Sequence, residues 1–285
     1  MQTAKYKQFS LYSPVFSWIT SYKQLIDVAV KLGVPAVEGL NFFELSTPDV
    51  EAAKELRAYA EERGIVFSCM SLAVDLVGGD TAKLIEDSKG YADVAKALGV
   101  PYLHHTIAFN ITDPTVFDGR EEESFQCGME AVRAIYDYAE SIGIRTIFED
   151  QGYLFNGVKN FGRFLNEVER DVGVVADVGN IYFADESIEG FLEAFMPRVC
   201  HVHLKDFVYI PADSVKEEPP HGYISRHGYI SDCEVGQGAV NFKDVLPTIR
   251  RAGYTGYYGL EFVAPQDDEQ KFLENLDFLQ ACMEL

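Results

Sequence analysis

Residues 199–206 read V-C-H-V-H-L-K-D, and this stretch decides how the rest of the chain is interpreted. Its apolar residues are typical of a β-strand, in which alternate side chains point to the same face. His201, His203 and Lys205 therefore share one face. Two imidazoles and an ammonium group are unusual on a strand in an ordinary core. They are expected where the inner face of a barrel passes from a packed interior to an open polar end, so the other strands should end in complementary chemistry.

Outward from this stretch, short apolar runs alternate with helical segments in both directions. The predicted strands are 8–12, 34–40, 65–72, 101–107, 144–149, 173–177, 199–204 and 257–262. The predicted helices are 22–32, 47–63 with Thr47-Pro48 as its cap and first residue, 80–98, 121–142, 161–169, 188–195, 241–252 and 268–283. Alternating strands and helices with no domain linker predict an α/β fold, a single (β/α)₈ TIM barrel over residues 1–285.

Glycines support the predicted helix ends, because the left-handed conformation that ends a helix favours them. The glycines that follow helices are Gly33, Gly64, Gly99, Gly143 and Gly253. A doubly wound open sheet is the alternative fold, but it requires a glycine-rich loop after the first strand. Residues 11–17 contain no glycine, which favours the barrel. A long loop is predicted at about 206–240, and loops of this length are usually functional or disordered.

Composition excludes several classes of protein. The formal net charge is −21 and offers no basic footprint for nucleic acid. No apolar run approaches the length of a membrane span, and the first residues lack the apolar core of a signal peptide, so we expect a cytoplasmic protein with no membrane partner. The five cysteines are scattered without a C-x-x-C motif, which argues against disulfides and structural zinc.

Polar residues occupy the ends of six predicted strands, where a TIM barrel has its active site. They are Glu38, His104-His105, Glu149, Asp177, His203 and Glu261. One such acid alone is better explained as a solvated loop residue, but the set is not. Three ionised carboxylates that converge would destabilise one another without a cation. Carboxylates with an imidazole suit Mn²⁺, Mg²⁺, Co²⁺, Fe²⁺ or Zn²⁺.

The sequence resembles the xylose isomerase-like barrel superfamily, in the branch of ketose 3-epimerases, inosose isomerases and inosose dehydratases. The resemblance covers nearly the whole chain. It depends on T-I-F-E-D at 146–150, V-A-D-V-G-N at 175–180, H-V-H-L-K-D at 201–206, G-Q-G-A-V-N-F at 236–242 and Y-G-L-E-F at 258–262. It implies one divalent metal, most often Mn²⁺. The metal ligands that it implies are Glu149, Asp177, His203 and Glu261.

The resemblance also implies roles in catalysis. Glu149 and Glu261 would remove and return a proton beside a metal-bound carbonyl, through an enediolate. Lys205 would stabilise negative charge on oxygen, or alternatively form an ion pair with a strand-end acid. His201, one step deeper than His203 on the same face, is expected to be a hydrogen-bonded residue of the barrel interior.

Four further residues are predicted to bind substrate. Glu38 would hold a substrate hydroxyl or lie directly behind the residues of the site, with a structural salt bridge as the equal alternative. His105 is preferred to its neighbour His104 because it falls six residues after Gly99, as Glu149 falls six after Gly143. The other two predicted substrate-binding residues are Asn180 and Arg226, and the loop of Arg226 could alternatively be solvated or contact another subunit of a homo-oligomer.

These residues predict an isomerase or epimerase of a sugar or inositol-type ketone, with a small carbohydrate as its partner. A lyase that removes water from an inosose-like ketone is the alternative on the same site. An apurinic-endonuclease-type hydrolase is disfavoured by the acidic composition and by Asn180, which stands where that class has a metal-binding histidine. A non-catalytic sugar-binding barrel is disfavoured by the complete set of ligands.

Overall fold

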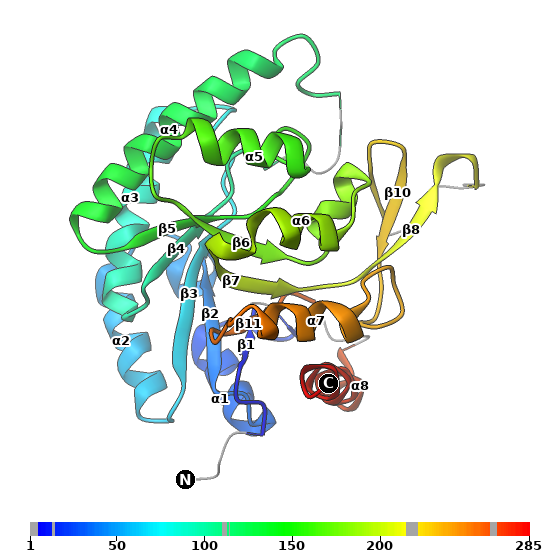
Figure 1. Cartoon of the computed structure of the whole chain (residues 1–285). Coiled ribbons are helices and arrows are strands. Elements are labelled where there is room, and N and C mark those ends of the chain that lie inside the picture. Colours follow the sequence, from blue (N-terminus) through cyan, green and yellow to red (C-terminus); the bar gives the residue numbers. More distant parts are fainter. Residues whose placement is uncertain (1–4, 13–14, 110–112, 114, 215–221, 263–266) are drawn as a thin grey trace.

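Parallel strands form a closed barrel that is surrounded by helices (Figure 1). The structure is a computed structural model and describes residues 5–12, 15–109, 113, 115–214, 222–262 and 267–285. The order around the barrel is β1-β11-β7-β6-β5-β4-β3-β2. Its strands are β1 (Phe9–Leu11), β2 (Ala36–Leu40), β3 (Val66–Leu72), β4 (Tyr102–His105), β5 (Arg145–Phe148), β6 (Gly173–Asp177), β7 (Val199–Leu204) and β11 (Tyr258–Leu260). The predicted (β/α)₈ barrel is confirmed.

The helices that cover the barrel follow the strands in chain order. They are α1 (Tyr22–Leu32), α2 (Val50–Glu61), α3 (Thr81–Leu98), α4 (Glu121–Ser141), α5 (Val158–Glu167), α6 (Ile188–Phe195), α7 (Phe242–Arg251) and α8 (Glu269–Met283). Short 3₁₀ turns are η1 (Phe43–Leu45), η2 (Asn180–Ala184), η3 (Met196–Arg198) and η4 (Ala212–Ser214). None of the helices in the described part of the chain is both long and apolar enough to cross a membrane.

Helix α2 begins later than predicted. Its N-cap is Asp49, whose side chain accepts hydrogen bonds from the backbone N–H groups of Glu51 and Ala52. A carboxylate also interacts favourably with the positive end of the helix dipole, and it satisfies two N–H groups that a cap at Thr47 would leave to solvent. The predicted cap at Thr47 is therefore wrong.

The inner face of the barrel changes from apolar to polar along the strands. A small apolar layer of Cys69, Ile147 and Val175 fills the lower interior. The inward residues two positions further along β5 and β6 are the carboxylates Glu149 and Asp177, because alternate residues of a strand share a face. The inner face of β5 and β6 therefore passes from apolar side chains to carboxylates at the end where these strands terminate.

The ladder between β2 and β3 contains a register shift beside Glu38. The paired residues on either side of the shift are Val37–Phe67 and Gly39–Met70. Strand β3 thus has one extra residue at this point, which defines a β-bulge. Ser68 and Cys69 both use the inner face there, since Ser68 Oγ lies 2.7 Å from Ser10 Oγ and Cys69 belongs to the inner apolar layer.

The predicted loop at 206–240 contains secondary structure that the sequence analysis missed. Its strands are β8 (Phe207–Pro211), β9 (Gly222–Ile224) and β10 (Gly228–Asp232). They form an antiparallel sheet in the order β8-β10-β9, which projects beyond the end of β7 (Figure 1). Phe207 and Ile230 pack there against Tyr153 and Phe183. Residues 215–221 of this segment lie outside the described part of the chain.

Candidate metal centre and cavity

A cavity of about 620 Å³ opens at the carboxyl ends of the barrel strands. Its floor includes carboxylates from β5 and β11, and its walls are largely aromatic. The aromatic side chains are Tyr12, Phe42, Phe109, Phe183, Phe207, Tyr223 and Phe262. Aromatic faces with a few converging polar groups are typical of a site for a small organic molecule. Phe42 and Phe109 belong to this wall.

Four side chains from four neighbouring strands converge at the base of this cavity. Glu149 directly follows β5, Asp177 ends β6, His203 lies in β7 and Glu261 directly follows β11. One nitrogen or oxygen from each lies within 4.8 Å of those of the other three. The structure thus brings together the four residues that were predicted as metal ligands. We call this group the metal-site cluster.

Distances within the metal-site cluster suit a single cation. His203 Nδ1 lies 3.2 Å from Glu261 Oε2, 3.4 Å from Glu149 Oε2 and 3.9 Å from Asp177 Oδ2. Ligand atoms bound about 2.1 Å from one cation lie about 3 to 4 Å apart. Three of these atoms, His203 Nδ1, Glu149 Oε2 and Glu261 Oε2, are buried and make no hydrogen bond to described residues outside the cluster, and the fourth, Asp177 Oδ2, has Lys205 Nζ 2.9 Å away. Buried polar atoms are normally paired, so the convergence of these atoms on one point fits a metal ion.

The charges of the cluster affect one another strongly. Burial lowers the pKa of His203, but Glu38, Glu149 and Glu261 raise it well above its ordinary value. Burial raises the pKa of Asp177, and nearby Lys205 only partly opposes this effect. The negative charge of these acids is therefore balanced by a proton on His203, by the raised pKa of Asp177 and by the Lys205 ammonium group. A divalent cation would supply the same compensation.

Lys205 forms ion pairs with two of the acids. Its Nζ lies 2.9 Å from both Asp177 Oδ2 and Glu261 Oε1. The side chain also lines the cavity, so its ammonium group can reach a molecule bound there. Both interpretations from the sequence, an ion pair and a group facing the substrate, are compatible with this position.

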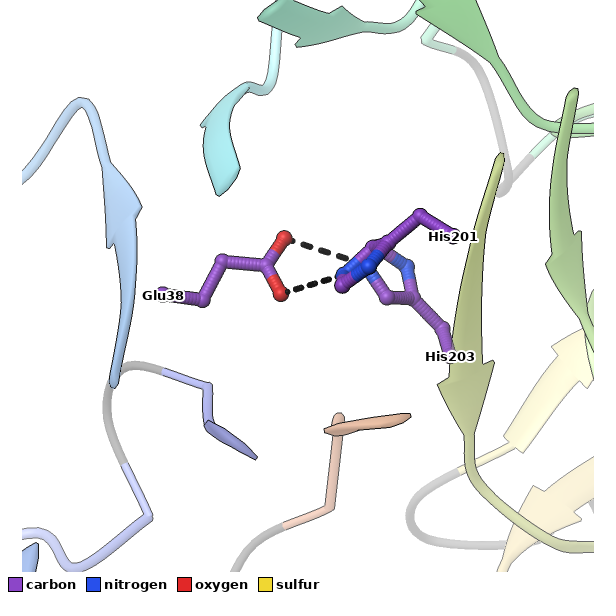
Figure 2. A group of neighbouring side chains, drawn as sticks. All are labelled: Glu38, His201 and His203. Atoms are coloured by element: carbon purple, nitrogen blue, oxygen red, sulfur yellow. Dashed lines mark hydrogen bonds and ion pairs between the residues drawn. The ribbon is translucent and has the colours of Figure 1, made fainter. Parts of the chain in front are cut away.

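Glu38 lies below the cavity rather than in its wall. It is fully buried and does not line the cavity. As Figure 2 shows, its carboxylate reaches from β2 toward His201 and His203 of β7, with Oε2 2.8 Å from His201 Nε2 and Oε1 3.0 Å from His203 Nε2. A direct contact of Glu38 with substrate does not fit this position, whereas a place behind the site residues and a structural salt bridge both fit it. His201 occupies the barrel interior, as predicted.

His104, and not the predicted His105, faces the cavity. His104 Nε2 lies 3.7 Å from Glu149 Oε1. His105 points outward, where its ring meets Phe148 with the ring centroids 4.6 Å apart. The ladder pairs Tyr102 with Arg145, so the connection after Gly99 is one residue longer than the one after Gly143. A shift of one residue moves a side chain to the opposite face, and counting from the glycines therefore failed.

The two remaining predicted substrate residues have different positions. Asn180 lines the cavity, and its side-chain nitrogen has no hydrogen-bond partner among the described residues. Arg226 instead donates to the backbone carbonyls of Tyr153 and Asn156 at 3.3 Å and is absent from the cavity lining. These carbonyls hold its guanidinium group outside the cavity lining, so the contact of Arg226 with substrate stays a prediction.

Several cavity residues were missed by the sequence analysis. Tyr12 lies edge-on to His203, with ring centroids 5.3 Å apart. Its position two residues after Ser10 places it on the inner face, and this alternation could have identified it. Gln151, Phe183 and Tyr223 also line the cavity. They come from loops and from the small sheet, where strand alternation gives no signal.

A closed barrel with carboxylates and an imidazole at the carboxyl ends of its strands belongs to the class of TIM barrels that carry their site at this end. The chain belongs to the xylose isomerase-like TIM barrel family, whose model matches residues 26–282. It is 23% identical over 190 residues to an inosose isomerase of Halalkalibacterium halodurans, covering 65% of this chain but only 61% of that protein. It is 22% identical over 225 residues to an inosose dehydratase of Serratia proteamaculans, covering 74% of each chain.

Solved structures share the fold. A D-psicose 3-epimerase of Clostridium cellulolyticum H10, determined with D-tagatose, has a TM-score of 0.73 at 18% identity and covers 98% of this chain and 100% of the epimerase. The IOLI protein, determined with a zinc atom, has a TM-score of 0.72 at 18% identity and covers 96% of each chain. At such identities the likeness concerns the fold alone.

Proposed function

We propose that this protein is a divalent-metal-dependent isomerase or epimerase of a sugar or inositol-type ketone. The observation that carries the proposal is the metal-site cluster, in which Glu149, Asp177, His203 and Glu261 direct four ligand atoms toward one point. The named activities of the relatives, inosose isomerase and inosose dehydratase, support the same substrate class. Mn²⁺ is the proposed cation, and Mg²⁺, Co²⁺, Fe²⁺ and Zn²⁺ are alternatives that the same donors accept.

The two glutamates are proposed as the acid and base. They come from β5 and β11, which are separated in the barrel by β6 and β7, so they approach the cavity from different sides. One would remove the proton next to the substrate carbonyl and the other would return it. The cation would supply positive charge that stabilises the carbonyl oxygen as negative charge develops there. Lys205, beside Glu261, would donate a hydrogen bond to a substrate oxygen.

The lining of the cavity favours an uncharged substrate. Its described carboxylates are Glu149, Asp206, Asp232, Glu234 and Glu261. Among the described lining residues, Lys205 is the single basic side chain with a fixed charge, and two acids already neutralise it. A phosphate or a sugar acid would add negative charge to this environment. We therefore propose a free polyhydroxy ketone rather than its phosphate ester.

Isotope exchange tests the proposal directly. The protein loaded with Mn²⁺ would be incubated in D₂O with a panel of ketoses and inososes, together with their phosphorylated forms, and followed by proton NMR. We expect deuterium at the carbon next to the carbonyl and formation of an isomer, with uncharged substrates only. Glu149→Gln serves as the control. Failure to bind any divalent metal, or no exchange with the whole panel, would contradict the proposal.

A lyase is the second candidate, because an inosose dehydratase aligns over 74% of this chain. Both reactions begin with removal of a proton next to a carbonyl, and the metal-site cluster serves either. The same NMR experiment separates them. Loss of water and appearance of a new CHD signal next to a carbonyl, as the enol product converts to a diketone, would identify the lyase, whereas exchange without water loss would identify the isomerase.

A further inference from the structure

Glu38 accepts hydrogen bonds from three neighbours. Besides His201 Nε2 and His203 Nε2 (Figure 2), Ser71 Oγ lies 2.5 Å from Glu38 Oε1. An ionised carboxylate offers acceptors only. Each of the three neighbours must therefore be a donor toward Glu38, and this requirement fixes the direction of every bond in the network.

The direction of the bond from His203 determines what its other nitrogen can do. When Nε2 carries the proton that is donated to Glu38, a neutral imidazole keeps a lone pair on Nδ1. Nδ1 is the atom that faces the acids of the metal-site cluster, 3.2 Å from Glu261 Oε2 and 3.4 Å from Glu149 Oε2. A lone pair in this direction suits a metal and would repel carboxylates if no cation lay between them.

The same logic extends through Ser71 to His104. Because the Ser71 hydroxyl donates its proton to Glu38, its oxygen remains as acceptor for His104 Nδ1, 3.1 Å away. A neutral His104 with its proton on Nδ1 has its lone pair on Nε2. This Nε2 is buried without a hydrogen-bond partner among the described residues, and His104 lines the cavity. It can therefore accept a hydrogen bond from a hydroxyl group bound there.

A glycine makes room for the network. Strands β1 and β11 lie between β2 and β7, so Glu38 must pass the inner face of β11 to reach the histidines. A Cβ atom on Gly259 of β11 would lie 2.8 Å from Glu38 Oε2 and 2.9 Å from His203 Cδ2. Such distances are too short for carbon, and any larger residue would displace the carboxylate or the imidazole.

We infer that Glu38 is a positioning residue that turns the Nδ1 lone pair of His203 toward the metal and, through Ser71, the Nε2 lone pair of His104 toward a substrate hydroxyl. The identity of these two targets rests on the proposed function. Carboxylates that orient metal-binding histidines in this way strengthen metal binding about 10- to 100-fold. The alternative is a second metal site formed by Glu38, His201 and His203, whose donor atoms also lie close together. Their distances of 2.8 and 3.0 Å are those of direct hydrogen bonds.

Calorimetric titration with Mn²⁺ tests the contribution of Glu38 to metal binding. In Glu38→Gln the amide nitrogen cannot accept, so at least one donor loses its partner. We expect the dissociation constant to rise about 10- to 100-fold and Gly259→Ala to have a similar effect. The controls are Glu44→Gln, at a residue that accepts from the backbone N–H of Tyr22, and Gly190→Ala, where the nearest atom to a Cβ would be Ser187 Oγ at an ordinary contact distance of 3.9 Å. Both controls should bind Mn²⁺ like the wild type.

Nitrogen NMR of ¹⁵N-histidine-labelled protein reports the position of each imidazole proton. With saturating Mg²⁺ we expect the proton of His203 on Nε2 and that of His104 on Nδ1. Ser71→Ala should shift the nitrogen signals of His104, because the acceptor for its Nδ1 proton is lost. The affinity of this variant for Mn²⁺ should stay within about threefold of wild type, an effect below about 0.7 kcal/mol. A merely structural role for Ser71 would leave the position of this proton unchanged.

The outcomes separate this inference from the proposed function. If wild-type protein binds no Mn²⁺, the proposed function fails, and the position of the His104 proton in metal-free protein then decides the inference. If wild type binds Mn²⁺ and folded Glu38→Gln binds it equally well, Glu38 does not position His203 and the inference is overturned. Two Mn²⁺ ions per wild-type chain, with one lost in Glu38→Gln, would show a second metal site and also overturn it.

Discussion

Replacement of Lys205 by methionine removes a positive charge from the metal-site cluster while nearly preserving side-chain length. Lys205 Nζ lies 2.9 Å from both Asp177 Oδ2 and Glu261 Oε1. The exposed fraction is 12% for the Lys205 side chain, 0% for Asp177 and 21% for Glu261. Without a metal, Lys205→Met would leave two largely buried carboxylates with no cationic partner at this distance. The metal-free variant should therefore be less stable than the wild type.

The size of this effect follows from the burial of the pair. Breaking a buried ion pair by removing one partner costs about 3–5 kcal/mol. Because Glu261 retains some contact with solvent, we expect the lower end of this range. A change of 1 kcal/mol shifts the melting temperature by about 2 °C in a chain of this size. Calorimetry in the presence of a chelator should thus show a decrease of about 6 °C.

Adding Mn²⁺ should reverse much of this loss. Asp177 Oδ2 is both a partner of Lys205 and one of the ligand atoms that converge in the metal-site cluster, so the ammonium group and a cation compete for it. Mn²⁺ should raise the melting temperature of Lys205→Met by more than that of the wild type. The control is Lys83→Met, whose ion pair with Asp87 is exposed and worth at most about 1 kcal/mol. Equal metal-induced shifts, or an unchanged metal-free melting temperature, would refute the reasoning.

Three further predictions concern catalysis and pH. Glu149→Gln and Glu261→Gln should each slow deuterium exchange about 10²- to 10⁴-fold, and a wild-type rate in either would show that the acid and base are assigned wrongly. His104→Asn should lower kcat/KM about tenfold through the loss of a substrate hydrogen bond, whereas His105→Asn should leave KM unchanged and lower the melting temperature. Burial lowers the pKa of His105 to about 4, below its unfolded value of about 6.5. Between these pH values the unfolded chain binds a proton that the folded chain does not, so the free energy of unfolding decreases as pH falls from about 6.5 to 4. Urea unfolding of His105→Asn should therefore depend less steeply on pH than that of the wild type, and equal slopes would exclude this role.

The barrel was predictable because each unit carries several agreeing signals. Strands β6 and β7 and helices α1 and α6 have the predicted bounds, since apolar runs and flanking turns mark both their ends. The four residues of the metal-site cluster could be predicted from the sequence because each is a polar residue at the end of an apolar strand. In a closed barrel these strand ends converge.

The contacts around Glu38 could not be predicted in the same way. Glu38 is 163 residues from His201 and 165 from His203 in the sequence. Its side chain can reach across the barrel only because Gly259 of β11 leaves room for the carboxylate. The choice between His104 and His105 depended on one residue in a connecting turn, which leaves no mark in composition. The strands β8 to β10 were missed because no helix separates them, so the alternation of strand and helix that marks the barrel is absent, and they pair with one another rather than with the barrel.

The bulge in β3 determines where the length of this strand can vary. Because Ser68 and Cys69 both use the inner face opposite Glu38 alone, deleting one of them would restore regular pairing with β2 and would leave Ser71 beside the Glu38 carboxylate. Deleting Met70 would instead move Ser71 by one position and turn its hydroxyl toward the surrounding helices. Among single-residue deletions in this strand, those at residues 68–69 are therefore expected to preserve the contacts of Glu38, whereas a deletion at residue 70 is expected to break them.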